Sequence, residues 1–460
     1  MAKVKKRIDQ IPDRLKLTEK EQRDYLAKFK ITVETLDNGT KFISFNCPYP
    51  DRQYTYIDVW FRTGAWNDPR EKMGLAHFTE HAVFLGCPVA PTYHERITRP
   101  EQGGYRLGGN TTFPDTNYFL EASSNLTSPK KYGILYGLDH LLSTIAQPYI
   151  KNDSLANEKK VVIDEYQLLK TKLDYMNTRF IWNQILPADH PYLNFVTGTE
   201  ATINAIDAKT IRNFLETAYV PQNAFLAIYS KGDPLKHAKV SRILKSKWLN
   251  GMKNRKGVLN PFPDYDWLIR HRGLSGQKKF CQVLPIKKGR AVVSLVKILE
   301  LNPYSKEAFA LDMALDIIDR VVFDSLRTKG YGYSPKLETD YIPFIGFGFC
   351  KTGIEIDSAK SDDLMTNFKM IFREAVKKAI KNEYHILEVK KKRFSVLDNP
   401  IPYAKRFREV FSGLYRFNQI IRPEDLNKII LSIKPQDVKV WLKDFAENPG
   451  ALFAVGDILA

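Results

Sequence analysis

The chain has 460 residues, of which 43% are hydrophobic, so it can build sizeable cores in about two domains. It contains no stretch of 18 apolar residues, and we therefore expect no membrane-spanning helix. Its four cysteines have no paired spacing, so they indicate neither a disulfide framework nor a cysteine zinc site and favour a reducing compartment. They are Cys47, Cys87, Cys281 and Cys350.

The net charge of +18 comes from lysines and arginines spread along the sequence. Such a charge can attract nucleic acid, an acidic membrane or acidic peptides. The sequence has no clustered aromatic and basic motif of the kind that binds RNA, so we interpret these residues as solvated faces and predict no specific nucleic-acid partner. The basic runs are Lys3–Arg7, Lys245–Lys256, Lys377–Lys381 and Lys390–Arg393.

Residues 1–30 form a basic N-terminal extension without the apolar core of a secretion signal. Acidic residues within it argue against a typical organelle-targeting peptide. We therefore expect a cytoplasmic protein, with a mitochondrion or a related organelle as the alternative. The acidic residues are Asp9, Asp13, Glu19 and Glu21.

The segment from Tyr56 to Arg62 is typical of a strand, and the helix expected after it contains His77-Phe78-Thr79-Glu80-His81. At 3.6 residues per turn, His77 and His81 lie on one helix face with Glu80 beside them. Two neutral imidazoles can bind zinc, and a neighbouring carboxylate can act as a base toward water. The alternative interpretation is a pair of ordinary core histidines that hydrogen bonds satisfy.

A catalytic zinc site needs a third protein ligand, and the segment Asn157–Glu165 offers two carboxylates on one predicted helix face. We expect this face to point inward because it also carries two valines, and an unpaired carboxylate is costly there. The alternative is a solvated acidic face paired with neighbouring lysines. The face comprises Glu158, Val161, Val162 and Glu165.

A pattern of helix, proline-containing turn, apolar strand and Gly-Asp occurs twice, in 214–233 and in 441–457. Two copies more than 200 residues apart predict two similar α/β domains rather than a solenoid. A helix expected at Lys306–Val322 contains no histidine, so one chain should bind one zinc ion. The predicted parts are an extension at 1–30, a zinc-binding domain at 31–233, a linker at 234–277 with some helix around Val240–Lys247, and a second domain at 278–460.

The segment Gly74–His81, followed by Phe84-Leu85-Gly86, resembles the active helix of the insulinase or pitrilysin peptidases, and Glu158–Glu165 resembles their downstream acidic element. The resemblance implies that His77, His81 and Glu165 are the zinc ligands, that Glu80 is the general base and that Glu158 is a supporting carboxylate. His81 and Glu165 are 84 residues apart, a few more than in the family. We assign the excess to an inserted, proline-containing loop at 88–104.

Further stretches extend the resemblance. Asn110, before a second strand at 115–119, is similar to the asparagine that this family presents to a bound peptide; the alternative is a structural turn. The segment 323–333 resembles the family's Arg and Tyr element, which implies that Arg327 and Tyr333, rather than Tyr331, hold the substrate and its developing oxyanion. His190 is expected to be a loop residue rather than a ligand.

The resemblance also implies the overall architecture: an α+β fold of two homologous domains, each a mostly antiparallel sheet flanked by helices, which together make one half of a clamshell peptidase. For a chain of this length, the resemblance implies a homodimer, or a heterodimer with a related subunit, that encloses an extended peptide. The expected function is a zinc-dependent endopeptidase. The alternative is a noncatalytic or partner-dependent scaffold subunit on the same fold.

Overall fold

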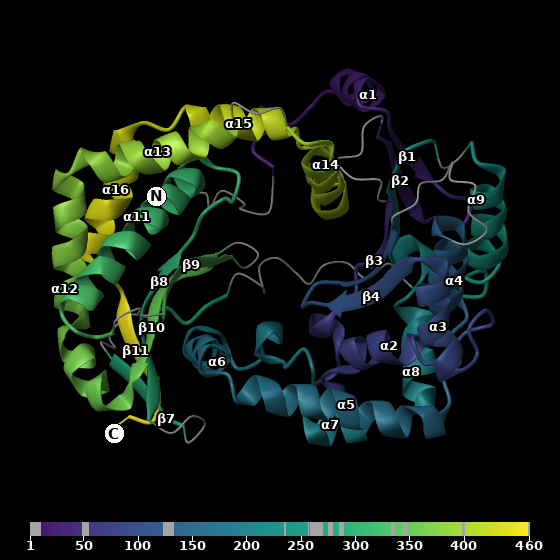
Figure 1. Ribbon diagram of the computed structural model, residues 1–460, viewed down its shortest axis with the longest axis horizontal. Coiled ribbons are helices and arrows are strands. Elements are labelled where there is room, and N and C mark those ends of the chain that lie inside the picture. The colour runs from purple at the N-terminus through teal and green to yellow at the C-terminus, as the bar shows by residue number, and fades with distance from the viewer. Residues whose placement is uncertain are drawn as a thin grey trace.

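The computed structural model describes residues 11–47, 55–122, 133–233, 236–255, 257, 270–274, 279–284, 289–332, 336–343, 347–397 and 401–458. The protein is an α+β structure with two mixed sheets, each flanked by helices, and the two sheets lie on opposite sides of the molecule (Figure 1). This confirms the predicted fold class. None of the helices in the described ranges is long and apolar enough to cross a membrane.

The first sheet has six strands in the order β1-β2-β6-β3-β5-β4. β2 and β6 pair in parallel, and the other neighbours are antiparallel. β4 is therefore an edge strand. The strands are β1 (Ile31–Thr35), β2 (Lys41–Asn46), β3 (Thr55–Phe61), β4 (Tyr105–Thr111), β5 (Thr116–Ala122) and β6 (Ala224–Ser230).

Apolar residues on one face of this sheet form the first core together with α2, α4, α5, α8 and the segment after β6. The helix predicted around Val240–Lys247 is present as α9 and the π-helical turn η6, and Trp248 of that turn is fully buried in the first core. The helices are α1 (Glu19–Lys28), α2 (Leu75–Val83), α3 (Tyr93–Gly103), α4 (Ile134–Ala146), α5 (Asn152–Lys170), α6 (Leu173–Ile185), α7 (Glu200–Asn204), α8 (Ala208–Thr217), α9 (Ala238–Ile243) and η6 (Leu244–Leu249).

The second sheet has five strands in the order β7-β11-β8-β10-β9, with β7 and β11 in parallel. They are β7 (Lys279–Val283), β8 (Arg290–Leu299), β9 (Lys336–Pro343), β10 (Gly348–Asp357) and β11 (Ala451–Gly456). The second core lies between this sheet and α11, α12 and α16. The remaining helices are α11 (Lys306–Thr328), α12 (Ser361–Lys381), α13 (Glu383–Leu397), α14 (Tyr403–Phe417), α15 (Pro423–Leu431) and α16 (Pro435–Glu447).

The two sheets share one topology. The run β2-β6-β3-β5-β4 of the first corresponds to β7-β11-β8-β10-β9 of the second, with one parallel pair at the same place in each. The repeated sequence pattern supplies equivalent elements, because α8 leads to β6 and α16 leads to β11. The prediction of two similar units is thus confirmed at the level of topology, while their boundaries stay a prediction.

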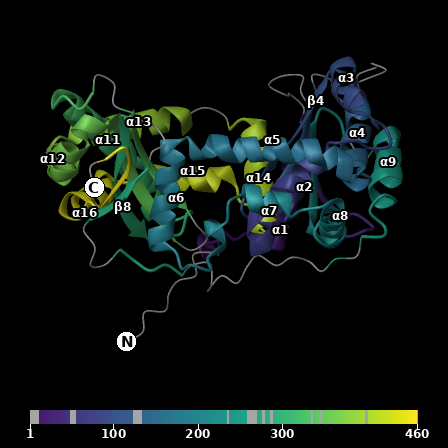
Figure 2. The ribbon, with the colours of Figure 1, turned by 90° about the horizontal axis from the view of Figure 1, so that it is seen from below.

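Each half of the molecule contributes one helix that packs on the sheet of the other half. α6 follows α5, which spans the gap between the halves, and packs on β8 and β11 (Figure 2). In return, α14 packs its aromatic face on β2 and β6 of the first sheet. Two polar contacts hold α6 in place: Lys351 Nζ donates to Asp174 Oδ1 at 2.6 Å, and Asn177 Nδ2 donates to Ser294 Oγ at 2.7 Å.

One local prediction is wrong. The stretch 88–104, predicted as an inserted loop, contains α3, which begins after a reciprocal capping box between Thr92 and Glu95. Pro100 lies inside the helix, and Gly104 ends it in the left-handed conformation at φ 62°. The Thr-x-x-Glu signal of a helix start was therefore present in the sequence, and the prolines obscured it.

Candidate metal centre

α2 is a short apolar helix whose start is fixed by a buried carboxylate. Asp68 Oδ2 accepts a hydrogen bond from the Gly74 amide at 2.8 Å, and Asp68 Oδ1 accepts one from the Ala76 amide at 2.9 Å. Gly74 has a φ of 87°, and a Cβ there would lie 2.6 Å from the backbone of Gly198. A glycine is thus required at this position both by conformation and by space.

Three side chains from two helices converge beside α2. His77 Nε2 and His81 Nε2 lie 3.6 Å and 3.7 Å from Glu165 Oε2 of α5. One ligand atom from each of the three residues lies within 4.8 Å of the other two, and this is the one such group in the described part of the chain. The residues nominated from the sequence as zinc ligands are therefore brought together.

The arrangement fits a metal better than it fits a set of hydrogen bonds. The nitrogen-to-oxygen distances are too long for hydrogen bonds but are close to the separation of about 3.3 Å between two ligands of a tetrahedral zinc ion with bonds of about 2.0–2.1 Å. Burial, with a smaller contribution from His81, lowers the pKa of His77 to about 3, so its imidazole is neutral and can offer a lone pair. Two imidazoles and one carboxylate are a donor set typical of catalytic zinc.

Glu158 orients one of the two histidines. Its Oε1 lies 2.8 Å from His81 Nδ1, so a proton on Nδ1 is shared with the carboxylate and His81 Nε2 is left to face the cluster. Burial alone would lower the pKa of His81, but the hydrogen bond that His81 donates to Glu158 and the charges of Glu165, Glu80 and Glu158 raise it above its usual value. His77 Nδ1 is buried and has no hydrogen-bond partner among the described residues.

The position of Glu165 corrects one expectation about α5. Val162 is fully buried, but Val161 is 45% exposed, so the four residues do not share an inward face. α5 buries only a narrow stripe against the first core, which includes Leu155 and Val162. The Glu165 side chain is consequently 43% exposed, at the edge of that stripe rather than under it.

Glu80 lies next to the cluster and is not part of it. The residue is 8% exposed, and its Oε2 accepts a hydrogen bond from Thr111 Oγ1 of the edge strand β4 at 2.8 Å. A Cβ on Gly109 would lie 2.7 Å from Glu80 Oε1, so the absence of a side chain there makes room for the carboxylate. Burial raises the pKa of Glu80, and the Thr111 hydrogen bond and the charge of His81 partly offset that rise.

Comparison with known proteins agrees with this geometry. Residues 49–186 match the insulinase family, peptidase family M16, and the matched segment includes α2 and α5 with all five residues of the site. The chain carries an insulinase-family domain. The predicted resemblance to the insulinase peptidases is thereby confirmed.

Relatives of the insulinase family match parts of the chain at low identity. "Insulin-degrading enzyme-like 2" of Arabidopsis thaliana is 25% identical over 248 residues, which are 51% of this chain and 24% of that protein. The chloroplastic "Stromal processing peptidase" of Oryza sativa subsp. japonica is 24% identical over 213 residues, 45% of this chain and 16% of that protein. The chain thus spans a quarter or less of the length of these curated relatives.

Two solved structures share the fold over nearly the whole chain. A "peptidase M16 inactive domain" from Pseudomonas fluorescens covers 94% of this chain and 99% of its own, with a TM-score of 0.73 and 13% identity. A "protease from Helicobacter pylori" covers 92% of this chain and 98% of its own, with a TM-score of 0.71 and 18% identity. Since the first of these proteins is described as an inactive domain, the insulinase fold alone does not imply catalysis.

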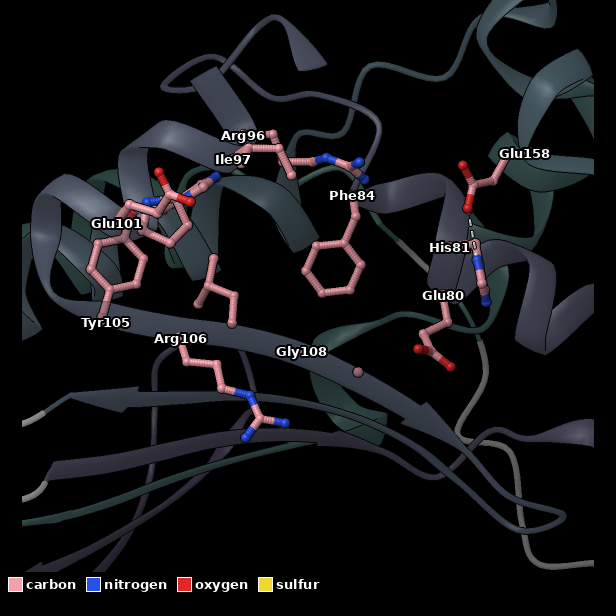
Figure 3. A pocket seen from close by; sticks show the side chains of 14 residues that line it. Glu80, His81, Phe84, Arg96, Ile97, Glu101, Tyr105, Arg106, Gly108 and Glu158 are labelled. Carbon is pink, nitrogen blue, oxygen red and sulfur yellow. Dashed lines mark hydrogen bonds and ion pairs between the residues drawn. The ribbon is translucent and has the colours of Figure 1, made fainter. Parts of the chain in front are cut away.

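A cavity of about 490 Å³ opens beside the candidate metal centre (Figure 3). Glu80, His81 and Glu158 lie at one end of it, residues of α3 lie at the other end, and β4 runs along it from Tyr105 to Gly108 beside Glu80. Its lining includes the apolar side chains of Phe84, Ile97 and Leu107. α3, which the sequence analysis took for a loop, therefore forms a wall of the site.

The remaining nominated residues are distributed over both halves. Asn110 is exposed on β4, one residue before Thr111. Arg327 is exposed near the C-terminal end of α11, in the second half, and is not part of the metal cluster. Tyr333 lies outside the described residues. Tyr331 is buried in the second core, where its hydroxyl donates to Asp363 Oδ2 at 2.5 Å.

His190 has a structural role, as expected. It is 2% exposed, and its Nδ1 accepts a hydrogen bond from the Tyr192 amide at 3.3 Å. Two site residues were missed by the sequence analysis, Thr111 and Asp68. Thr111 contacts a residue 31 positions earlier in the chain, and Asp68 lies six residues before its first amide partner, so no short local pattern indicates either contact.

Proposed function

We propose that the chain is a zinc-dependent endopeptidase that cleaves unfolded peptides bound in an extended conformation. The observation that carries this proposal is the convergence of His77, His81 and Glu165, with the buried carboxylate of Glu80 next to them. All five residues that a catalytic member needs are retained, which argues against the alternative of a noncatalytic scaffold subunit.

In this proposal His77, His81 and Glu165 hold the zinc ion, and Glu158 holds His81 in the correct tautomer. Zinc in a site with an open position supplies Lewis acidity toward water and toward a peptide carbonyl. Because burial lowers the pKa of His77, its imidazole is neutral and its ring nitrogen can bind a metal ion. The four cysteines are free, which fits a reducing compartment such as the cytoplasm, the location that we propose.

Glu80 carries the proton transfer. Its Oε2 is occupied by Thr111, whereas Oε1 faces the space above Gly109. A carboxylate placed in this way takes a proton from the attacking water and delivers it to the leaving amine nitrogen. Burial raises the pKa of Glu80, which makes the carboxylate a stronger base than an exposed glutamate.

The edge strand β4 is the proposed platform for the substrate. No other strand of the described residues pairs with its outer edge, so an extended peptide can add to it through main-chain hydrogen bonds, with Asn110 as a side-chain contact. The cavity between β4 and α3 would then receive a substrate side chain next to the scissile bond. Arg327 and Tyr333 would act on the oxyanion, from the same chain or from the second subunit of a homodimer or heterodimer.

Zinc content and chelation test the proposal directly. The purified chain should bind one zinc ion and cleave an unstructured peptide, and a chelator should abolish the cleavage until zinc is added back. Metal analysis and separation of the peptide products measure both effects. Zinc binding without any cleavage, across a panel of unstructured peptides, would favour the scaffold alternative instead.

Replacing Glu158 with glutamine should weaken zinc binding by about 10- to 100-fold, because an amide no longer provides a charged acceptor for the His81 Nδ1 proton. Competition with a chromogenic chelator measures the zinc affinity. Asp164→Asn is the matched control, since Asp164 is an exposed carboxylate on the same helix. Equal zinc affinities of the two variants would contradict the role of Glu158.

A further inference from the structure

The two oxygens of the Glu80 carboxylate have different surroundings. Oε2 accepts the hydrogen bond from Thr111 Oγ1 at 2.8 Å, and both residues are buried, at 8% and 9% exposure. Oε1 is the oxygen nearest to Gly109, where a Cβ would lie only 2.7 Å away. Both oxygens therefore lie against β4, Oε2 in the hydrogen bond from Thr111 and Oε1 beside the space that Gly109 leaves open.

Thr111 is itself held by the sheet. It lies opposite Thr116 in the register of β4 and β5, with the two hydroxyl oxygens 3.4 Å apart. The Thr116 hydroxyl donates to the Thr63 carbonyl at 3.0 Å, so it presents a lone pair rather than a proton to Thr111. Thr111 Oγ1 is closer to the charged Glu80 Oε2, at 2.8 Å, than to Thr116 Oγ1, at 3.4 Å. The Thr111 proton therefore goes to Glu80, because a hydrogen bond to a charged acceptor is stronger than one to a neutral hydroxyl.

We propose that Thr111 is a positioning residue that reserves Glu80 Oε1 for proton transfer. This inference rests on the proposed peptidase function. When Oε1 takes a proton from the attacking water, Oε2 still accepts from Thr111, now as a carbonyl oxygen. The proton then leaves Oε1 for the amine, and the Thr111 proton is not transferred at any stage. The same hydrogen bond thus fixes the rotamer of Glu80 in both protonation states, on a rigid strand rather than on a loop.

Two substitutions separate the hydroxyl from the rest of the side chain. Thr111→Val keeps the shape and removes the hydroxyl, whereas Thr111→Ser keeps the hydroxyl and removes a methyl group. With zinc bound, Thr111→Val should lower kcat by about 10- to 100-fold, the loss expected for one hydrogen bond to a charged group, with KM nearly unchanged. Thr111→Ser should recover most of kcat. A valine variant with the wild-type kcat, or a serine variant as impaired as valine, would overturn the proposal.

A second readout does not depend on activity. In a double-mutant cycle on the zinc-free full-length chain, Thr111→Val should lower the melting temperature when Glu80 is present, because the buried carboxylate loses its donor. It should have little effect in a Glu80→Ala background. Additive shifts in melting temperature would show that the two residues are not coupled and would overturn the inference. If the wild-type chain cleaves no peptide, the proposed function fails, and the cycle still decides whether Thr111 holds Glu80.

Discussion

Replacing Glu80 with glutamine is expected to lower kcat for peptide cleavage by about 10²- to 10⁴-fold and to leave zinc bound. Glutamine has nearly the same shape as glutamate, so it can occupy the space beside Gly109 and still accept from Thr111. It cannot take a proton at neutral pH. Glu80 is not a member of the metal cluster, so the ligand set stays complete.

Steady-state kinetics on an unstructured peptide and zinc analysis of the same sample measure the two halves of this expectation. Glu71→Gln is the matched control, because Glu71 is an exposed glutamate just before the same helix and should have the wild-type kcat. Loss of zinc from Glu80→Gln would make Glu80 a ligand rather than a base. Equal cleavage by Glu80→Gln and the wild type would refute its role as the base.

The ligand pair could be predicted from sequence because the geometry of a helix is local. His77 and His81 are four residues apart, and any helix places them on one face. The third ligand is different, since Glu158 and Glu165 are both candidates on α5. The resemblance to the insulinase peptidases implied that Glu165 is the ligand and Glu158 the supporting carboxylate. The packing of α5 against α2 agrees with these proposed roles, because Glu165 lies near both Nε2 atoms and Glu158 lies next to His81 Nδ1.

The incorrect local predictions come from short sequence patterns that are compatible with two different structures. Val161 fits the buried side of a helical wheel but is exposed, because α5 buries only a narrow stripe. The prolines at 88–104 indicated a loop, yet the capping box at Thr92 starts α3. The exposure of Val161 could be settled only by knowing what α5 packs against, which is information from distant parts of the chain. The start of α3, by contrast, was indicated locally by Thr92 and Glu95.

Contacts between residues that are far apart in the sequence could not be predicted from it. Thr111 and Glu80 are 31 residues apart, and a hydroxyl on an edge strand has no pattern that pairs it with a carboxylate on a helix. The exchange of α6 and α14 between the two sheets is non-local in the same way. The repeat, by contrast, was visible because equivalent elements carry equivalent local signals.

The largest effect on stability is expected from Asp68→Ala, which should lower the free energy of unfolding by about 2–4 kcal/mol. Asp68 is 6% exposed, and its two oxygens accept from two amides at the start of α2. Alanine leaves both amides without their acceptor in a buried place. The first turn of α2 then loses order directly before His77, so zinc affinity should fall together with stability. Denaturant titration of the zinc-free chain and chelator competition measure the two effects.

The chain supplies a matched control at another helix. Asp207 caps α8 by accepting from the Thr210 amide at 2.8 Å, but this contact is exposed to solvent, and water can replace the carboxylate. Asp207→Ala should therefore cost about 0.5–1 kcal/mol and leave zinc affinity unchanged. Asp68→Asn should fall between the two alanine variants, because an amide retains one acceptor and places a donor opposite the second amide. A destabilisation by Asp68→Ala no larger than that by Asp207→Ala would contradict the importance of the buried cap for the metal helix.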